Sequence, residues 1–232
     1  MNERIYQQVE LTRVGEGSRT VQERIIRETE LILYVNGELY ATALVLAGRE
    51  KEYAAGLIYS SGSITHASDI ASITIKGNVV DVKLTRVLEQ RTPGSVNSNL
   101  IIRRADIFAC VRAILKSPVF EETEAVHSAG LFKNGKDGIA ITEDIGRQHA
   151  FDKVIGQALL AGADFGSLLA ASTGRIPLEM IIKCSNTGIP IITTKGVPTS
   201  AAVELAEINN ITIAGLVRGR NMVVYCHPER IS

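Results

Sequence analysis

The segments LLAASTGR, residues 168–175, and IPIITTKG, residues 189–196, decide the fold of this chain. Each begins with a short, continuous apolar run, the pattern of a strand that is buried on both faces, and each ends in a turn with one glycine and one cation. They lie within Ser167 to Glu207, where each strand leads into a helix. Two strand-to-helix units in succession predict a parallel sheet, and therefore an α/β fold.

The helix after the first strand begins near Pro177, because proline is favoured in the first helical turn. Gly188 is expected just past its end. After the second strand, Thr199 or Ser200 is placed to cap a helix from Ala201 to about Ile208.

The two turns predict an anion site. Open α/β sheets bind ligands at the carboxyl ends of their strands, where helix N-termini present free N–H groups. Arg175 beside Gly174 and Lys195 in the next turn add positive charge. We therefore expect a phosphate-bearing ligand here. The alternative is that Arg175 and Lys195 are solvated loop cations.

Composition narrows the class of protein. The 232 residues carry 25 Lys plus Arg and 25 Asp plus Glu, so the net charge of zero argues against a general nucleic-acid binder. Asp164 interrupts the best apolar segment, so no membrane span is expected, and the polar N-terminus shows no secretory signal. Cys110, Cys184 and Cys226 are odd in number and widely spaced, which favours the cytoplasm over a disulfide framework.

The residues before the linker predict a small α+β domain, residues 1–98. Asn36-Gly37 and Lys76-Gly77-Asn78 each lie between β-rich runs and predict hairpins. Arg49 to Ser60 predicts a helix. Residues 1–23 carry no clear pattern, and Gln90 to Asn99 is the best linker candidate.

The larger domain is expected over residues 99–232. A helix from Arg103 to about Lys116 is ended by Pro118, a hairpin turns at Asn134-Gly135, and a helix from about Asp144 to Ala161 follows. The last two strands are expected at Ile211 to Val217 and Met222 to Tyr225.

Acidic and imidazole groups cluster in Glu143-Asp144-Ile145-Gly146-Arg147-Gln148-His149. Either this cluster is a site or it is only an acidic helix N-terminus. His127 is more typical of a structural histidine. Cys226-His227 suggests zinc, but no cysteine pair has ligand spacing, so no metal site is expected. A deaminase-like metal hydrolase using His127, Glu143 or Cys226 is the least favoured function.

Several motifs in fixed order, from about residue 24 to the end, resemble the FdhD family, the formate dehydrogenase accessory proteins. The motifs are Val35-Asn36-Gly37-Glu38, Ala54-Ala55-Gly56-Leu57, Glu143–Arg147 with Asp152-Lys153, Thr173-Gly174-Arg175 with Glu179-Met180, Gly188-Ile189-Pro190, Pro198-Thr199-Ser200 with Ala202–Ala206, Arg218-Gly219-Arg220 and His227–Ile231.

The resemblance implies a sulfur carrier. Such a protein takes sulfur from a cysteine desulfurase and passes it to molybdenum cofactor, in the bis-molybdopterin guanine dinucleotide form, for formate dehydrogenase. It also implies a cytidine-deaminase-like, three-layer α/β/α C-terminal domain that lacks the zinc site and binds the guanine nucleotide end of the cofactor. Arg175, Lys195, Thr199 and Ser200 would then hold phosphates, Arg147 and Arg218 would add charge, and Asp144 would accept from a base or ribose.

Two departures from the family pattern bear on function. Sulfur-carrying members hold a Cys-x-x-Cys pair in a loop, and the corresponding Arg91 to Ser98 has no cysteine. The family usually has Arg-His-Asn where this chain has Arg147-Gln148-His149. We therefore keep two hypotheses, a sulfur carrier and a cofactor-binding chaperone without sulfur transfer. A homodimer is compatible with either hypothesis.

Overall fold

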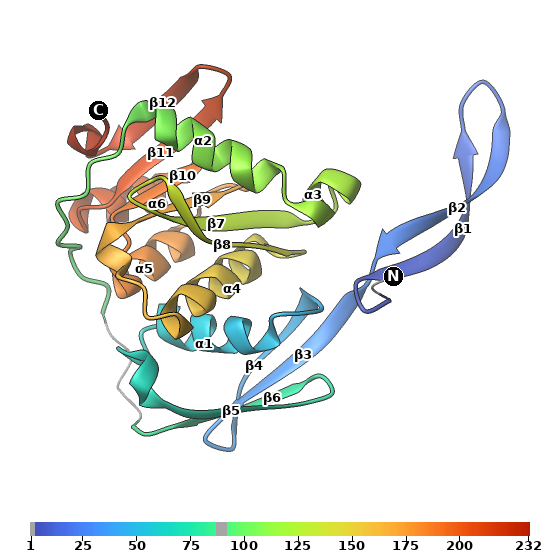
Figure 1. Cartoon of the computed structure of the whole chain (residues 1–232), viewed down its shortest axis with the longest axis horizontal. Helices are drawn as coiled ribbons and strands as arrows, with labels where there is room; N and C mark the ends of the chain where they lie inside the picture. Colours follow the sequence, from blue (N-terminus) through green and yellow to red (C-terminus); the bar gives the residue numbers. More distant parts are fainter. Residues whose placement is uncertain (1–2, 87–91) are drawn as a thin grey trace.

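A computed structural model describes residues 3–86 and 92–232 (Figure 1). Its central element is a six-stranded sheet in the order β12-β11-β10-β9-β7-β8. The strands are β7 (His127–Lys133), β8 (Asp137–Asp144), β9 (Leu168–Ser172), β10 (Ile191–Thr194), β11 (Thr212–Arg218) and β12 (Asn221–Cys226). β10 pairs in parallel with both β9 and β11. The parallel arrangement predicted from the two strand-to-helix units is therefore confirmed.

Helices cover both faces of this sheet. On one face lies α2 (Arg104–Leu115), which packs through Ile107, Val111 and Ile114 against Leu169, Ala171 and Ile191 of the sheet. On the other lie α4 (Arg147–Leu160), α5 (Leu178–Thr187) and α6 (Ser200–Ile208) (Figure 1). This α/β/α layering agrees with the expected fold class.

A second sheet of four strands, in the order β4-β3-β6-β5, lies beyond α4. The predicted hairpins are β3 (Glu28–Val35) with β4 (Glu38–Leu46), and β5 (Ile70–Lys76) with β6 (Val79–Leu84). The predicted helix is α1 (Glu50–Ser60), between this sheet and α4. The main hydrophobic core runs without a break from Leu31 and Ile58 to Ile192, so the two parts share one core. The domain boundary at residue 98 stays a prediction.

Two strands and one α-helix of the described residues have no counterpart in the sequence-based prediction. Residues 1–23 carry no clear pattern, yet β1 (Tyr6–Val14) and β2 (Ser18–Ile26) form a hairpin ribbon that projects from the molecule (Figure 1). Every side chain in these two strands is exposed or half-buried, so neither face of the ribbon enters the core. A ribbon that buries no face does not require the alternation of apolar and polar residues by which strands are predicted. The short helix α3 (Pro118–Thr123) begins at the proline that also stops α2. The expected linker lies partly at residues 90–91, outside the described residues, and residues 92–101 form no helix or named strand.

α1 and α4 cross in direct backbone contact. A Cβ added at Gly56 would lie 1.8 Å from the carbonyl oxygen of Asp152, and one added at Gly156 would lie 1.8 Å from that of Glu52. Because any side chain at either position would clash with main-chain atoms, only glycine permits this approach. The pair of glycines therefore sets how closely the small sheet is held to the large one.

Candidate functional site

Most of the sequence-predicted site residues lie along one edge of the six-stranded sheet, which we call the rim. The rim is where β9, β10 and β11 end and where β7 begins. It holds the turns after β9 and β10, the end of β11 and the loop after β8. The predicted residues placed at the rim or in the loops and helix starts that leave it are Asp144, Arg147, Gly174, Arg175, Lys195, Thr199, Ser200 and Arg218.

The two glycine-containing turns lie side by side. Thr194 Oγ1 donates to the Gly174 carbonyl at 2.5 Å, and a Cβ at Gly196 would lie 3.0 Å from that same oxygen and 3.4 Å from the Arg175 nitrogen. Arg175 and Lys195 are both exposed beside this contact. A side chain at Gly196 would therefore press on the Gly174–Arg175 backbone, so glycine favours the close approach of the two turns.

The strand ends are joined further by main-chain bonds. The Ile176 N–H donates to the Val197 carbonyl, and the Thr199 N–H donates to the Ile176 carbonyl, each at 3.0 Å. The Thr199 hydroxyl accepts from the Ala202 N–H and caps α6, which confirms one of the two caps considered. Because Thr199 is engaged as a cap, the exposed Ser200 has the freer hydroxyl.

Arg218 fixes the next strand end to the same turn. Its Nε donates to the Lys195 carbonyl at 3.1 Å, and the Leu216 N–H donates to the Gly196 carbonyl at 2.7 Å. The guanidinium of Arg218 therefore lies beside the β10 turn and leaves its other N–H groups available to a ligand.

A pocket of about 300 Å³ opens at the β7 end of the rim. The residues that line it are Leu115, Phe120, Glu124, Ala125, Val126, His127, Ile145, Thr173 and Lys195. Lys195 is the predicted site residue among them. The wall formed by Phe120 and Glu124 comes from α3 and its end, which sequence analysis missed. The available signal was Ser117-Pro118, since proline in a first turn begins helices as well as ending them.

His127 and Arg147 approach one another next to Gly174. A Cβ at Gly174 would lie 3.0 Å from Arg147 Cδ and 3.2 Å from His127 Cε1. Burial lowers the pKa of His127, and the nearby Arg147 guanidinium lowers it further, against the opposing effect of Asp144. His127 Nδ1 lies 3.2 Å from the Thr173 hydroxyl. The structure therefore brings His127, which sequence analysis considered structural, to the rim.

Three buried side-chain atoms near the rim make no hydrogen bond within the described residues. Among the described residues, Arg147 Nε, Ser128 Oγ and Thr193 Oγ1 are buried without a hydrogen-bond partner. Ser128 and Thr193 lie at the starting end of β7 and the finishing end of β10. Ser128 and Thr193 are fully buried, whereas Arg147 is half-buried, so of these three atoms Arg147 Nε is the one placed to donate to a ligand at the rim.

Asp144 is held by the fold. Its side chain is fully buried, and its Oδ2 lies 2.7 Å from Lys153 Nζ and 3.2 Å from the Leu46 N–H. Its Oδ1 accepts from the Gly146 N–H at 3.1 Å and lies 3.4 Å from His149 Nδ1. Since both oxygens are engaged, the structure favours a positioning role for Asp144 over the expected contact with a base or ribose.

The rest of the acidic cluster is likewise structural. Glu143 accepts from the Phe120 N–H at 2.6 Å and so ties α3 to β8. His149 stacks edge-on against Tyr53 of α1, with ring centroids 5.5 Å apart. The expected acidic helix N-terminus is wrong, because Glu143 and Asp144 end β8 and α4 begins at Arg147 with no acid in its first turn and no side-chain cap. The cluster instead stabilises the loop before α4, and Arg147 is its member beside the rim.

The three cysteines are buried. Cys110 and Cys226 donate to backbone carbonyls, and burial raises the pKa of their thiols to about 12 and about 11. Burial also raises the pKa of Cys184. None of them presents a reactive thiolate to solvent. The described residues hold no group of three or more His, Cys, Asp and Glu side chains placed to share a metal ion.

Comparison with known proteins identifies the family. The model of the FdhD/NarQ family matches residues 26–94 and 84–232. The chain belongs to the FdhD/NarQ family. The sulfur carrier protein FdhD of Methanothermobacter thermautotrophicus is 31% identical, over 98% of this chain and 99% of that protein. The one from Sulfurisphaera tokodaii is 29% identical, over 96% and 98%.

A solved structure supports the same family. The crystal structure of a formate dehydrogenase accessory protein from Desulfotalea psychrophila matches with a TM-score of 0.89 and 27% identity, covering 98% of this chain and all of that one. The two family-model matches overlap at residues 84–94, which include the first part of Arg91 to Ser98, the segment that corresponds to the family's cysteine pair. Within residues 3–86 and 92–232, no helix is both long and apolar enough to cross a membrane.

Proposed function

We propose that this FdhD/NarQ protein binds molybdenum cofactor at the rim, as bis-molybdopterin guanine dinucleotide, and so supports maturation of a formate dehydrogenase in the cytoplasm. The observation that carries the proposal is the meeting of the β9 and β10 turns, where Arg175 and Lys195 flank a tight contact between Gly196 and the Gly174 carbonyl. Backbone N–H groups and cations at such a place bind phosphate.

Each rim residue has a part in this proposal. Arg175, Lys195 and Ser200 hold phosphate oxygens, and Arg218 adds charge from the neighbouring strand end. Arg147, with its unpartnered Nε, closes the site on the β7 side. Asp144 positions the loop from which Arg147 extends, through its bond to the Gly146 N–H.

Nucleotide binding tests the proposal. Calorimetry with GDP and ADP should show tighter binding of GDP, and Lys195→Ala and Arg175→Ala should each weaken it roughly tenfold, as expected for a lost charge-assisted bond. Lys51→Ala removes another exposed cation, on α1, and serves as the control. Equal affinity for the two nucleotides, or an equal loss in the control, would count against the site.

Two versions of this function differ in sulfur chemistry. The name sulfur carrier protein, borne by the relatives, favours transfer of sulfur from a cysteine desulfurase to the cofactor. The burial of Cys110, Cys184 and Cys226 favours a chaperone that only holds the cofactor. Intact-mass measurement after incubation with a desulfurase and cysteine separates them: an added sulfur supports the carrier, and an unchanged mass supports the chaperone.

A further inference from the structure

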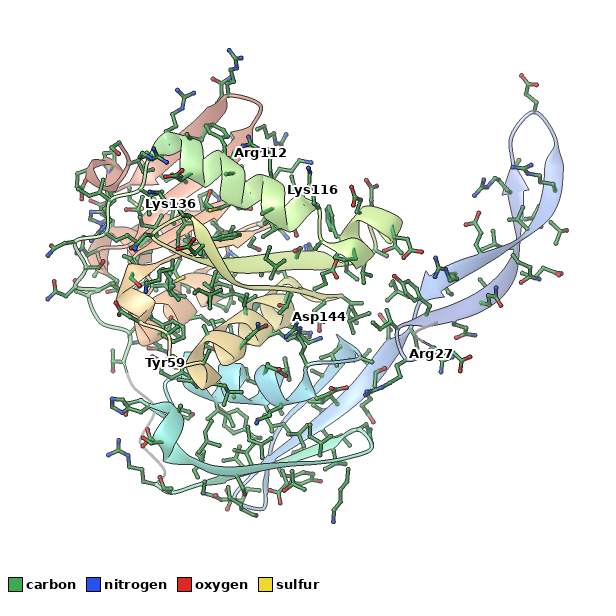
Figure 2. All side chains as sticks on the ribbon, in the orientation of Figure 1. Arg27, Tyr59, Arg112, Lys116, Lys136 and Asp144 are labelled. Carbon is green, nitrogen blue, oxygen red and sulfur yellow. The ribbon has the colours of Figure 1, made fainter. Side chains whose placement is uncertain are left out.

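The outward side of α2 carries a row of cations. Arg104, Phe108, Arg112 and the C-cap residue Lys116 follow one another at every fourth position, so each is a neighbour of the next along a row that slants around the helix. The three cations are exposed and Phe108 is half-buried. From Arg104 to Lys116 the row extends about 18 Å, at 1.5 Å per residue. Figure 2 shows Arg112 and Lys116 along α2, on the way to α3.

A hollow of about 410 Å³ lies beside this row, where α2 meets the β11–β12 turn. We call it the α2 groove, and it is lined by Arg104, Ala105, Phe108, Arg112, Gly219 and Arg220. The Arg104 guanidinium lies over the Phe108 ring, 5.5 Å from its centroid, and donates to the Arg220 carbonyl. The groove therefore joins a small apolar surface to three guanidinium groups. It shares no lining residue with the rim pocket.

The cations of the α2 groove have no carboxylate partner among the described residues. Among the ion pairs of the described residues, none involves Arg104, Arg112 or Arg220. The one acid within α2, Asp106, is held by a bidentate pair with Arg103, at 2.8 and 2.9 Å. Because the whole chain has no net charge, the positive electrostatic potential of these cations is a local feature of the α2 groove and does not reflect an overall positive charge.

We propose that the α2 groove binds an acidic segment of another protein, with one aromatic or branched apolar side chain in the hollow and carboxylates on both sides. Arginine binds carboxylates in bidentate fashion, and clustered arginine and aromatic side chains are typical of the residues that dominate protein interfaces. The zero net charge and the single aromatic side chain favour an acidic peptide over nucleic acid, which is bound by broad basic surfaces with several stacking rings. This inference does not depend on the cofactor proposal.

Peptide selection tests the inference. A library of random 12-residue peptides displayed on phage is selected on the full chain and on the Arg112→Glu/Arg220→Glu variant. We expect the full chain to enrich acidic peptides with one aromatic or branched apolar residue, and the variant to lose that enrichment. A labelled peptide from the selection should bind at least about tenfold more weakly to Arg112→Glu and to Arg220→Glu, and more weakly as salt is raised.

Lys51→Glu is the matched control, since it reverses an exposed helical cation on α1, across the molecule from α2. It should bind the peptide as the full chain does. The inference is overturned if selection enriches no acidic sequence, if Lys51→Glu weakens binding as much as Arg112→Glu, or if a 12-nucleotide RNA binds more tightly than the peptide. Displacement of the peptide by GDP would also overturn it, by making the groove an extension of the rim site.

Discussion

At the scale of single residues, two buried ion pairs make further hydrogen bonds to parts of the chain that are far away in sequence. Asp144 pairs with Lys153, whose ammonium also donates to the Leu46 carbonyl at 2.7 Å. Asp152 pairs with Lys183 at 2.6 Å and accepts from the Ser60 hydroxyl at 2.8 Å. Both pairs carry hydrogen bonds beyond the pair itself, and such bonds help to offset the cost of burying two charges.

Replacing Asp144 with asparagine should destabilise the protein by about 3–5 kcal/mol, because the Lys153 ammonium is left buried without its counter-charge. Urea unfolding gives the free energy of unfolding. Asp137→Asn, at the exposed start of the same strand, should stay within about 0.5 kcal/mol of the unchanged protein. A loss no larger than that of Asp137→Asn would mean that the Asp144 pair contributes nothing to stability.

His127 should make stability depend on pH. Its pKa in the folded protein lies below the usual value of about 6.5, so the unfolded chain binds more protons as the pH falls through that value. The free energy of unfolding should therefore decrease from pH 7 towards pH 5. In His127→Gln that decrease should be smaller, as measured by urea unfolding at each pH. Identical slopes for the two proteins would contradict the lowered pKa.

At the scale of elements, the crossing of α1 on α4 is the contact least tolerant of change. Gly56→Ala or Gly156→Ala should each cost roughly 3 kcal/mol, since a methyl group cannot enter a backbone contact without separating the helices. Gly138→Ala is the control, because its added carbon would meet only ordinary contacts at 3.7 and 3.8 Å. Thermal unfolding gives both values, and equal midpoints for Gly56→Ala and Gly138→Ala would refute the close crossing.

The elements also show what could be predicted from sequence. The strands β9 and β10 and the rim between them were predictable, because parallel pairing brings successive strand ends together whatever the side chains do. The engagement of Asp144 was not, since its partner Leu46 lies 98 positions away in sequence. The pocket wall from α3 was missed because Pro118 suits both the end of one helix and the start of the next.

At the scale of the whole molecule, the two sheets share one hydrophobic core. The glycine crossing and the hydrogen bonds from the Leu46 N–H to Asp144 and from the Ser60 hydroxyl to Asp152 all connect residues before position 98 with residues after it. The interface between the two parts contains packed helices and buried charges, so relative motion of the parts is restricted. Such an interface is typical of a single cooperative unit.

The chain should therefore unfold in one transition. Urea unfolding followed by tyrosine fluorescence and by far-ultraviolet circular dichroism should give coincident curves, because loss of the α1–α4 contact exposes the core of both sheets. The tyrosines used as the probe lie mostly before residue 98, with Tyr225 in β12 as the exception. Two separated transitions would instead support an independent domain that ends near residue 98.

The contact between Gly56 and Gly156 has an evolutionary consequence. A substitution at either glycine alone is destabilising, so no single neutral mutation can change the distance or the angle between α1 and α4. Divergence should instead accumulate around it, in the ribbon and the surface turns, while the spacing between the small sheet and the rim is inherited unchanged.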